Sequence, residues 1–190
     1  MPLYLAAAFA LALAILIATF LVLATYNDIV ALVQRIDKAW ANIDVVLKQR
    51  HDQLPNLVAA VRDVMEFEQG VLEEVTRLRD RYDPVRPVLE QGALSAETSR
   101  AVRSLLAVVE NYPQLKSGAN VLTLQAEIQR IETLIADRRE LYNDQVYRYN
   151  ARIAQVPAAF LAGLFGWRAR EFFTATEDDQ QRPDTNLPPA

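Results

Sequence analysis

The stretch LYLAAAFALALAILIATFLVLATY, residues 3–26, decides the fold, because it holds no charged residue over 24 positions. As a helix it would be about 36 Å long, against about 30 Å for the hydrocarbon core of a bilayer. Tyr4 and Tyr26 stand at its two ends, where aromatic rings favour the membrane interface. We therefore predict a transmembrane anchor over residues 1–27.

A cleavable signal peptide is the alternative reading of this segment. Val22-Leu23-Ala24 would serve as a cleavage box. However, no basic residue precedes the apolar run, and the run exceeds the roughly 7–15 residues usual for signal peptides. These two features favour an uncleaved anchor.

The residues that flank and line the anchor suggest its orientation and a contact face. Arg35 and Lys38 follow it, so the positive-inside rule places the N-terminus outside and the body in the cytoplasm. Small residues every four positions allow two membrane helices to approach closely. Alanines at this spacing form a candidate oligomer face, unless they only reflect the abundance of alanine here: Ala6, Ala10, Ala14 and Ala18.

The body of the chain has helical periodicity throughout. Its first apolar seam steps by four and three, as in coiled coils: Ile29, Val33, Ile36, Trp40, Ile43 and Leu47. We expect an all-α fold, in which the transmembrane helix precedes an antiparallel up-and-down four-helix bundle with long coiled-coil-like helices over residues 28–156.

Prolines and glycines set the predicted helix ends. Pro55 disfavours helical geometry at the preceding residue, and one helix over 28–82 would be about 80 Å long. We therefore predict a tight turn at 53–56 between helices over 28–51 and 57–82. A loop over 83–94 follows, and Ser95 caps the third helix. The fourth helix begins near Val121 and is stopped by Pro157.

The C-terminal part divides into an apolar segment and an acidic tail. Residues 157–173 form a short apolar or amphipathic segment, which either caps the bundle or contacts a membrane or partner. Its large side chains are the candidate contacts: Phe160, Leu164, Phe165, Trp167, Phe172 and Phe173. Residues 174–190 are polar, acidic and proline-bearing, so we expect a disordered tail.

Composition excludes several kinds of chemistry. The net charge of −4 argues against nucleic acid as a partner. The chain has no cysteine, and its one histidine, His51, lacks the Glu-x-x-His context of a di-iron bundle. No phosphate-binding glycine motif occurs. We predict no catalytic residue, no metal and no cofactor.

Polar residues on the amphipathic helices remain to be explained. Buried polar groups need hydrogen-bond partners, so these residues form either an internal network that fixes helix register or a binding surface. They are Arg50, Asp52, Asn56, Glu110, Glu132, Asn143 and Asn150.

Several motifs, in the right order over about residues 20–168, resemble the LemA family. They include residues 26–27, 39–40, 43–45, 47–48, 50–58 (RHDQLPNLV), 110–116 (ENYPQLK), Glu132, Arg139, 142–144, 149–150 and 156–157. The resemblance implies a bacterial, membrane-anchored four-helix bundle without a known enzyme activity. Some members accompany membrane proteases, and one serves the formation of an organelle membrane.

Together these observations give one leading hypothesis and two others. The leading one is a non-enzymatic scaffold or adaptor, single-pass in the bacterial cytoplasmic membrane, whose partners are the lipid bilayer and either a second copy or another membrane protein. The alternative is a regulatory or substrate-presenting partner of a membrane protease, or a protein of organelle membrane formation. An enzyme would require a bound metal or cofactor, for which the sequence offers no ligands.

Overall fold

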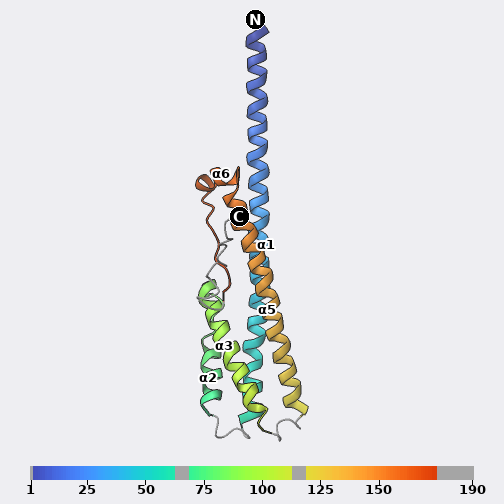
Figure 1. Cartoon of the computed structure of the whole chain (residues 1–190), viewed down its shortest axis with the longest axis vertical. Helices are drawn as coiled ribbons and strands as arrows, with labels where there is room; N and C mark the ends of the chain where they lie inside the picture. The colour runs from blue at the N-terminus through green and yellow to red at the C-terminus, as the bar shows by residue number, and fades with distance from the viewer. Residues whose placement is uncertain (1, 63–68, 113–118, 175–190) are drawn as a thin grey trace, which may run out of the picture. The chain divides into compact units, whose positions relative to one another are not determined.

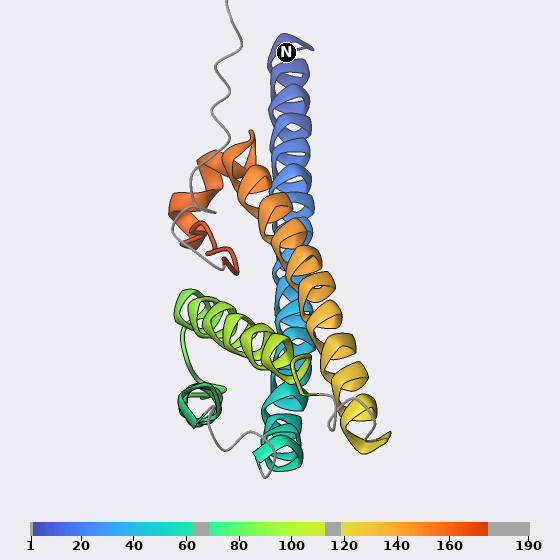
Figure 2. The same cartoon turned by 60° about the horizontal axis from the view of Figure 1, so that its bottom comes forward.

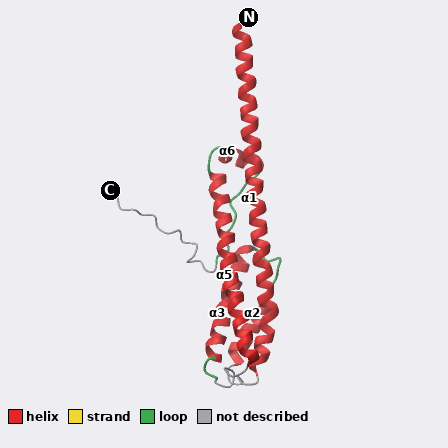
Figure 3. Cartoon of the chain, turned by 90° about the vertical axis from the view of Figure 1, so that its right-hand side faces the viewer, coloured by secondary structure: helices red, strands yellow, loops and turns green. Residues whose placement is uncertain are grey.

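The computed structural model describes residues 2–62, 69–112 and 119–174, and within these ranges the chain is helical with no strand (Figures 1 and 3). The predicted all-α class is therefore confirmed. Its helices are α1 (Pro2–Arg62), α2 (Gln69–Asp80), α3 (Val88–Val109), α5 (Ala119–Ala154) and α6 (Ala158–Phe165). The predicted acidic tail lies outside the described residues, apart from Thr174.

The chain divides into two compact units. The first unit comprises Met1–Ala39 and Asp144–Arg170, and the second comprises Trp40–Asn143 and Glu171–Ala190. The helices α1 and α5 contribute residues to both units, whereas α2 and α3 belong to the second and α6 to the first. The up-and-down four-helix bundle and its boundaries at 28 and 156 stay predictions.

The second unit has a hydrophobic core to which α1, α2, α3 and α5 all contribute. The α2 and α3 helices, joined by residues 81–87, pack against each other (Figure 2). The core residues are Leu54, Leu57, Val58 and Val61 from α1, Leu72, Val75 and Leu78 from α2, Leu94, Ala101, Val102, Leu105 and Val109 from α3, and Val121 and Ile128 from α5. Their three- and four-residue spacing is the seam that an amphipathic helix presents to a core.

The predicted turn at residues 53–56 is wrong, because α1 continues through Pro55 to Arg62. A proline inside a helix costs about 3 kcal/mol. Leu54 and Leu57 on either side of it are almost fully buried in the core. Burying one such side chain contributes about 1.5–3 kcal/mol, so the packing of this stretch offsets the local penalty.

The predicted loop over 83–94 is confirmed only for residues 83–87, and the predicted N-cap at Ser95 is wrong. The α3 helix begins at Val88, directly after Pro87, and Ser95 lies two turns inside it. Pro87 has the extended backbone of a residue before a helix, and Glu90 in the first turn complements the helix dipole. Because Gln91 and Leu94 are buried, tertiary packing extends the helix toward its N-terminus.

The first unit contains the apolar segment of α1. Every side chain from Leu3 to Leu21 is exposed, and burial within this unit begins at Thr25 and Ile29. By length and composition, α1 holds a stretch able to cross a membrane, none of which is buried within the protein. The part of α5 in this unit buries Val146 and Tyr149.

Candidate functional site

A buried polar network in the second unit joins α1, α3 and α5. The Arg50 guanidinium donates through Nη1 to the Ser95 carbonyl oxygen (3.3 Å), to Ser99 Oγ (2.9 Å) and to Glu132 Oε1 (3.2 Å). Its Nη2 donates to Ser95 Oγ at 3.2 Å. Ser99 Oγ in turn donates to Glu132 Oε2 at 2.5 Å. One arginine therefore holds a backbone carbonyl and three side chains from two other helices.

The electrostatics of Arg50 follow from its burial. Removal from water lowers the pKa of Arg50, while the charge and hydrogen bond of Glu132 oppose that shift. A buried charge of this kind is tolerated only when it is paired and hydrogen-bonded. The predicted polar network is thus confirmed for Arg50 and Glu132.

Other polar residues expected in the network lie elsewhere. Asp52 is exposed and contacts Lys48 at 3.4 Å, and the Asn56 amide donates to Gln53 Oε1 at 3.1 Å. Glu110 is exposed at the end of α3. These three residues therefore lie on the surface of the second unit and are not part of the network.

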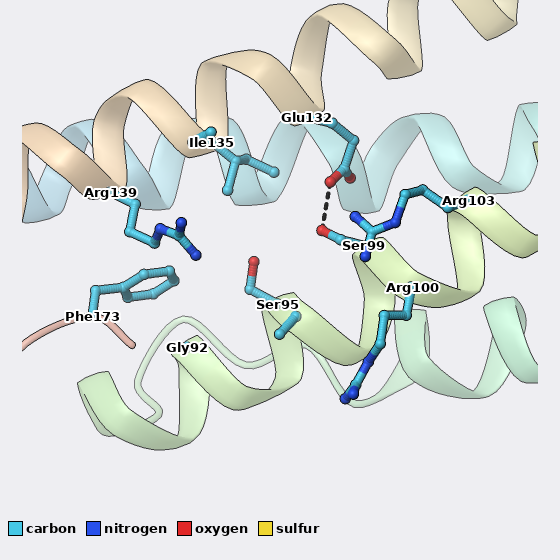
Figure 4. Close-up of a pocket in the computed structure, with 11 residues that line it drawn as sticks. Gly92, Ser95, Ser99, Arg100, Arg103, Glu132, Ile135, Arg139 and Phe173 are labelled. Atoms are coloured by element: carbon cyan, nitrogen blue, oxygen red, sulfur yellow. Dashed lines mark hydrogen bonds between the residues drawn. The ribbon is translucent and has the colours of Figure 1, made fainter. Parts of the chain in front are cut away.

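A cavity of about 320 Å³ lies beside the network, between α3 and α5 (Figure 4). Its wall on α5 includes Glu132, Ile135 and Arg139, and Phe173 contributes an aromatic ring. In Figure 4 the Ser95 hydroxyl and the Arg139 guanidinium point into the space from different helices. The remaining lining residues come from α3 and α5: Gly92, Ala96, Ser99, Arg100, Arg103 and Ala136.

Asn143 fixes the segment that closes this cavity. Its Oδ1 accepts the Phe173 backbone N–H at 2.8 Å, and its Nδ2 donates to the Phe173 carbonyl at 3.2 Å. The Phe173 ring packs on Trp40, with centroids 5.8 Å apart, and is only 2% exposed. Phe173 is therefore a core residue, and its prediction as a partner or membrane contact is corrected. Phe172 beside it is 38% exposed.

Glycine at position 92 allows the same segment to approach α3. A Cβ atom there would collide with the carbonyl oxygen of Thr174. A backbone that passes this close leaves room only for hydrogen, so Gly92 has a packing role although it lies inside a helix.

Asn150 makes the corresponding arrangement in the first unit. Its Oδ1 accepts the Arg170 backbone N–H at 2.9 Å, and its Nδ2 donates to the Arg170 carbonyl at 3.0 Å. Two further residues of this unit, Arg152 and Asp28, form an ion pair at 2.6 Å between α5 and α1. Asn143 and Asn150 thus each bind the backbone of one residue in the segment that follows α6.

An aromatic cluster forms where the apolar part of α1 ends. Tyr26 contacts Phe165 and Trp167, with ring centroids 5.2 and 6.3 Å away, and those two rings stack at 5.1 Å. On α6, Phe160 and Leu164 are 80% and 78% exposed. The α6 helix is therefore held against the Tyr26 region of α1 and presents unpartnered apolar side chains.

The four alanines of the candidate oligomer face, Ala6, Ala10, Ala14 and Ala18, are exposed on α1. A role of this face in self-association stays a prediction. The same is true of partner or membrane contacts by Phe160, Leu164, Phe165, Trp167 and Phe172.

His51 lies beside a hydrogen-bonded tyrosine on the surface of the second unit. Its ring is 5.2 Å from that of Tyr82, whose hydroxyl donates to Asp44 Oδ1 at 2.9 Å. Burial, and then this hydrogen bond, raise the pKa of Tyr82. Among the described residues, no group of three or more His, Asp and Glu side chains is placed to hold a metal ion.

Sequence reasoning missed the residues that shape the cavity, chiefly Ser99, Arg103 and Arg139. A signal was present, because Ser95, Ser99 and Arg103 recur every four residues and so share one face of a helix. Reading Ser95 as an N-cap assigned its hydroxyl to the helix end, and so concealed that Ser95 shares this face with Ser99 and Arg103.

The described residues define an all-helical protein with one helix able to cross a membrane. A model of the LemA family matches residues 39–187, and the chain belongs to that family.

Two relatives from Paramagnetospirillum magneticum, magnetosome proteins MamQ 2 and MamQ 1, are each 25% identical to it over 189 aligned residues. Each alignment covers 86% of this chain and 67% of the relative. The magnetosome protein MamQ of Magnetospirillum gryphiswaldense is 25% identical over 174 residues, with 78% of this chain and 64% of the relative covered. The chain therefore spans about two thirds of the length of these relatives.

Proposed function

We propose that this protein is a non-enzymatic adaptor, anchored in the bacterial cytoplasmic membrane by the apolar part of α1 and acting by self-association. The observation that carries the proposal is the complete exposure of residues 3–21 on α1. In water so long an apolar surface would be strongly unfavourable, at about 25 cal/mol for each Å² exposed. A bilayer and a second membrane helix both offer the cover that this surface lacks.

Self-association through the alanine face is the part of the proposal that the chain makes easiest to test. Because the protein has no cysteine, a single introduced cysteine is unique. Ala10→Cys lies on the four-residue repeat, whereas Ala12→Cys is the same substitution about 200° around the helix. Oxidation in native membranes should give a disulfide-linked dimer for Ala10→Cys and much less for Ala12→Cys. Equal yields, or no dimer from either, would refute the alanine interface.

We propose in addition that α6 contacts the membrane surface. The ring contacts of Tyr26 hold α6 beside the end of the apolar stretch, where aromatic side chains favour the interface. An environment-sensitive label on Phe160→Cys should be quenched by spin-labelled lipids in vesicles that hold the full chain. The exposed position Leu122 on α5 supplies the control label. Equal quenching at both sites, or none at Phe160→Cys, would argue against a membrane contact by α6.

A second candidate is a MamQ-type role in building or remodelling a membrane compartment. The relatives named magnetosome proteins favour it, since three of them match most of this chain. Two experiments distinguish the candidates. Affinity purification from native membranes should recover a second copy of the chain if it is a self-associating adaptor, and a membrane protease if it is a protease partner. Removal of the protein should cause loss or deformation of an internal membrane if it has the MamQ-type role.

A further inference from the structure

The cavity between α3 and α5 has a strongly basic lining. Three of its residues are arginines, Arg100, Arg103 and Arg139, and none of them makes an ion pair or hydrogen bond with any described residue. By contrast Arg130 on α5, which does not line the cavity, is paired with Glu127 at 2.7 Å. The guanidinium groups at the cavity therefore retain their full capacity to bind an anion.

Among the described residues that line the cavity, the one acidic side chain does not neutralise this charge. Glu132 is bound to Arg50 at 3.2 Å and accepts the Ser99 hydroxyl, so its carboxylate is already paired inside the network. Arg103 and Arg139 are then left as excess positive charge on two facing helices. Figure 4 shows both guanidinium groups directed toward the space between the helices, whereas Arg100 turns away.

A buried hydroxyl adds a neutral donor to the same wall. Ser95 is 5% exposed, and its Oγ accepts a hydrogen bond from Arg50. Its own hydrogen is donated to no described residue, and Figure 4 shows the hydroxyl pointing into the cavity. The small residues Gly92, Ala96 and Ala136 leave the space open.

We propose that this cavity binds a phosphate group, with Arg139 and Arg103 as the charged donors and the Ser95 hydroxyl as a neutral donor. Guanidinium groups match phosphate oxygens in a two-bond geometry, which lysine does not offer. A volume of about 320 Å³ suits a phosphate with a small substituent. The phosphate belongs either to a small soluble molecule or to the headgroup of an anionic phospholipid.

The test uses the full chain in maltoside micelles, which carry no phosphate, at constant ionic strength. One arm titrates inorganic phosphate against chloride. The other arm adds phosphatidylglycerol, with uncharged diacylglycerol as its comparison. A ligand at ten times its Kd should raise Tm by about 3–6 °C. Arg139→Gln and Arg103→Gln should each weaken the affinity about tenfold, so that the same ligand concentration raises Tm by only about 1–2 °C. Arg130→Gln removes one arginine charge outside the cavity and should leave the ligand-induced rise in Tm unchanged.

Each outcome bears on the proposal. Stabilisation by inorganic phosphate that the cavity variants lose identifies a soluble ligand. Stabilisation by phosphatidylglycerol alone, lost in the same variants, identifies a lipid headgroup. No stabilisation in either arm, or an equal effect in wild type and both cavity variants, overturns the site. Arg103 is exposed, so its variant should fold and keep the test valid if Arg139→Gln does not fold.

Discussion

Replacing Glu132 by glutamine should destabilise the second unit by about 3 kcal/mol. The change keeps the size of the side chain but removes the charge that pairs with Arg50 among the described residues. The Arg50 side chain is 6% exposed. Breaking a buried ion pair costs about 3–5 kcal/mol, because it leaves a charge without compensation. Glu132 is itself 22% exposed, and Arg50 keeps its bonds to Ser95 and Ser99, so the lower end applies.

Thermal unfolding of the full chain in micelles, followed by far-UV circular dichroism, measures this cost. A loss of about 3 kcal/mol should lower Tm by about 6–12 °C in a chain of this length. Glu127→Gln is the matched control, since it breaks an exposed pair with Arg130 on the same helix. Because solvent screens an exposed pair, this control should lower Tm far less than Glu132→Gln does.

A double-mutant cycle separates the ion pair from other effects of the substitution. Arg50→Met removes the buried charge that Glu132→Gln leaves unpaired, so the double variant should be more stable than the two single effects predict, by about 2 kcal/mol. Additive losses, or a loss for Glu132→Gln no larger than that of the exposed control, would refute the network as a source of stability.

Two further predictions concern the packing of α3 and the hydrogen-bonded Tyr82. Gly92→Ala should lower the free energy of unfolding by about 1–3 kcal/mol, because the added methyl group would displace the carbonyl of Thr174. Gly70→Ala is the control, since Gly70 has open space around it, and it should not lower this free energy. Thermal unfolding compares the two variants. The pKa of Tyr82 is raised on folding, so its stabilising effect is complete below about pH 10 and is lost as the pH rises above that value. Urea unfolding from pH 8 to 11 should therefore show a smaller alkaline loss for Tyr82→Phe than for wild type, whereas the exposed Tyr147→Phe should behave as wild type.

The sequence alone determined the all-α fold class of the protein and the apolar segment near its N-terminus. Residues 3–26 carry an uncharged and mostly apolar run, and the seams that follow have a helical period, so local composition was sufficient for both inferences. The family motifs could also be recognised from the sequence, because they depend on residue identity and order. Arg50 and Glu132 were recognised as polar residues on apolar faces, although the sequence did not show that they meet.

Tertiary structure decided where helices begin and end and which polar groups come together. Local rules placed a turn at Pro55 and a cap at Ser95, but the burial of Leu54, Leu57 and Leu94 outweighs both signals. The basic cavity also depends on tertiary packing. Arg103 and Arg139 are 36 positions apart, and only the packing of α3 on α5 brings their unpaired charges to one space. Sequence periodicity fixes which face of a helix is apolar, whereas the partner of each face depends on contacts between distant segments.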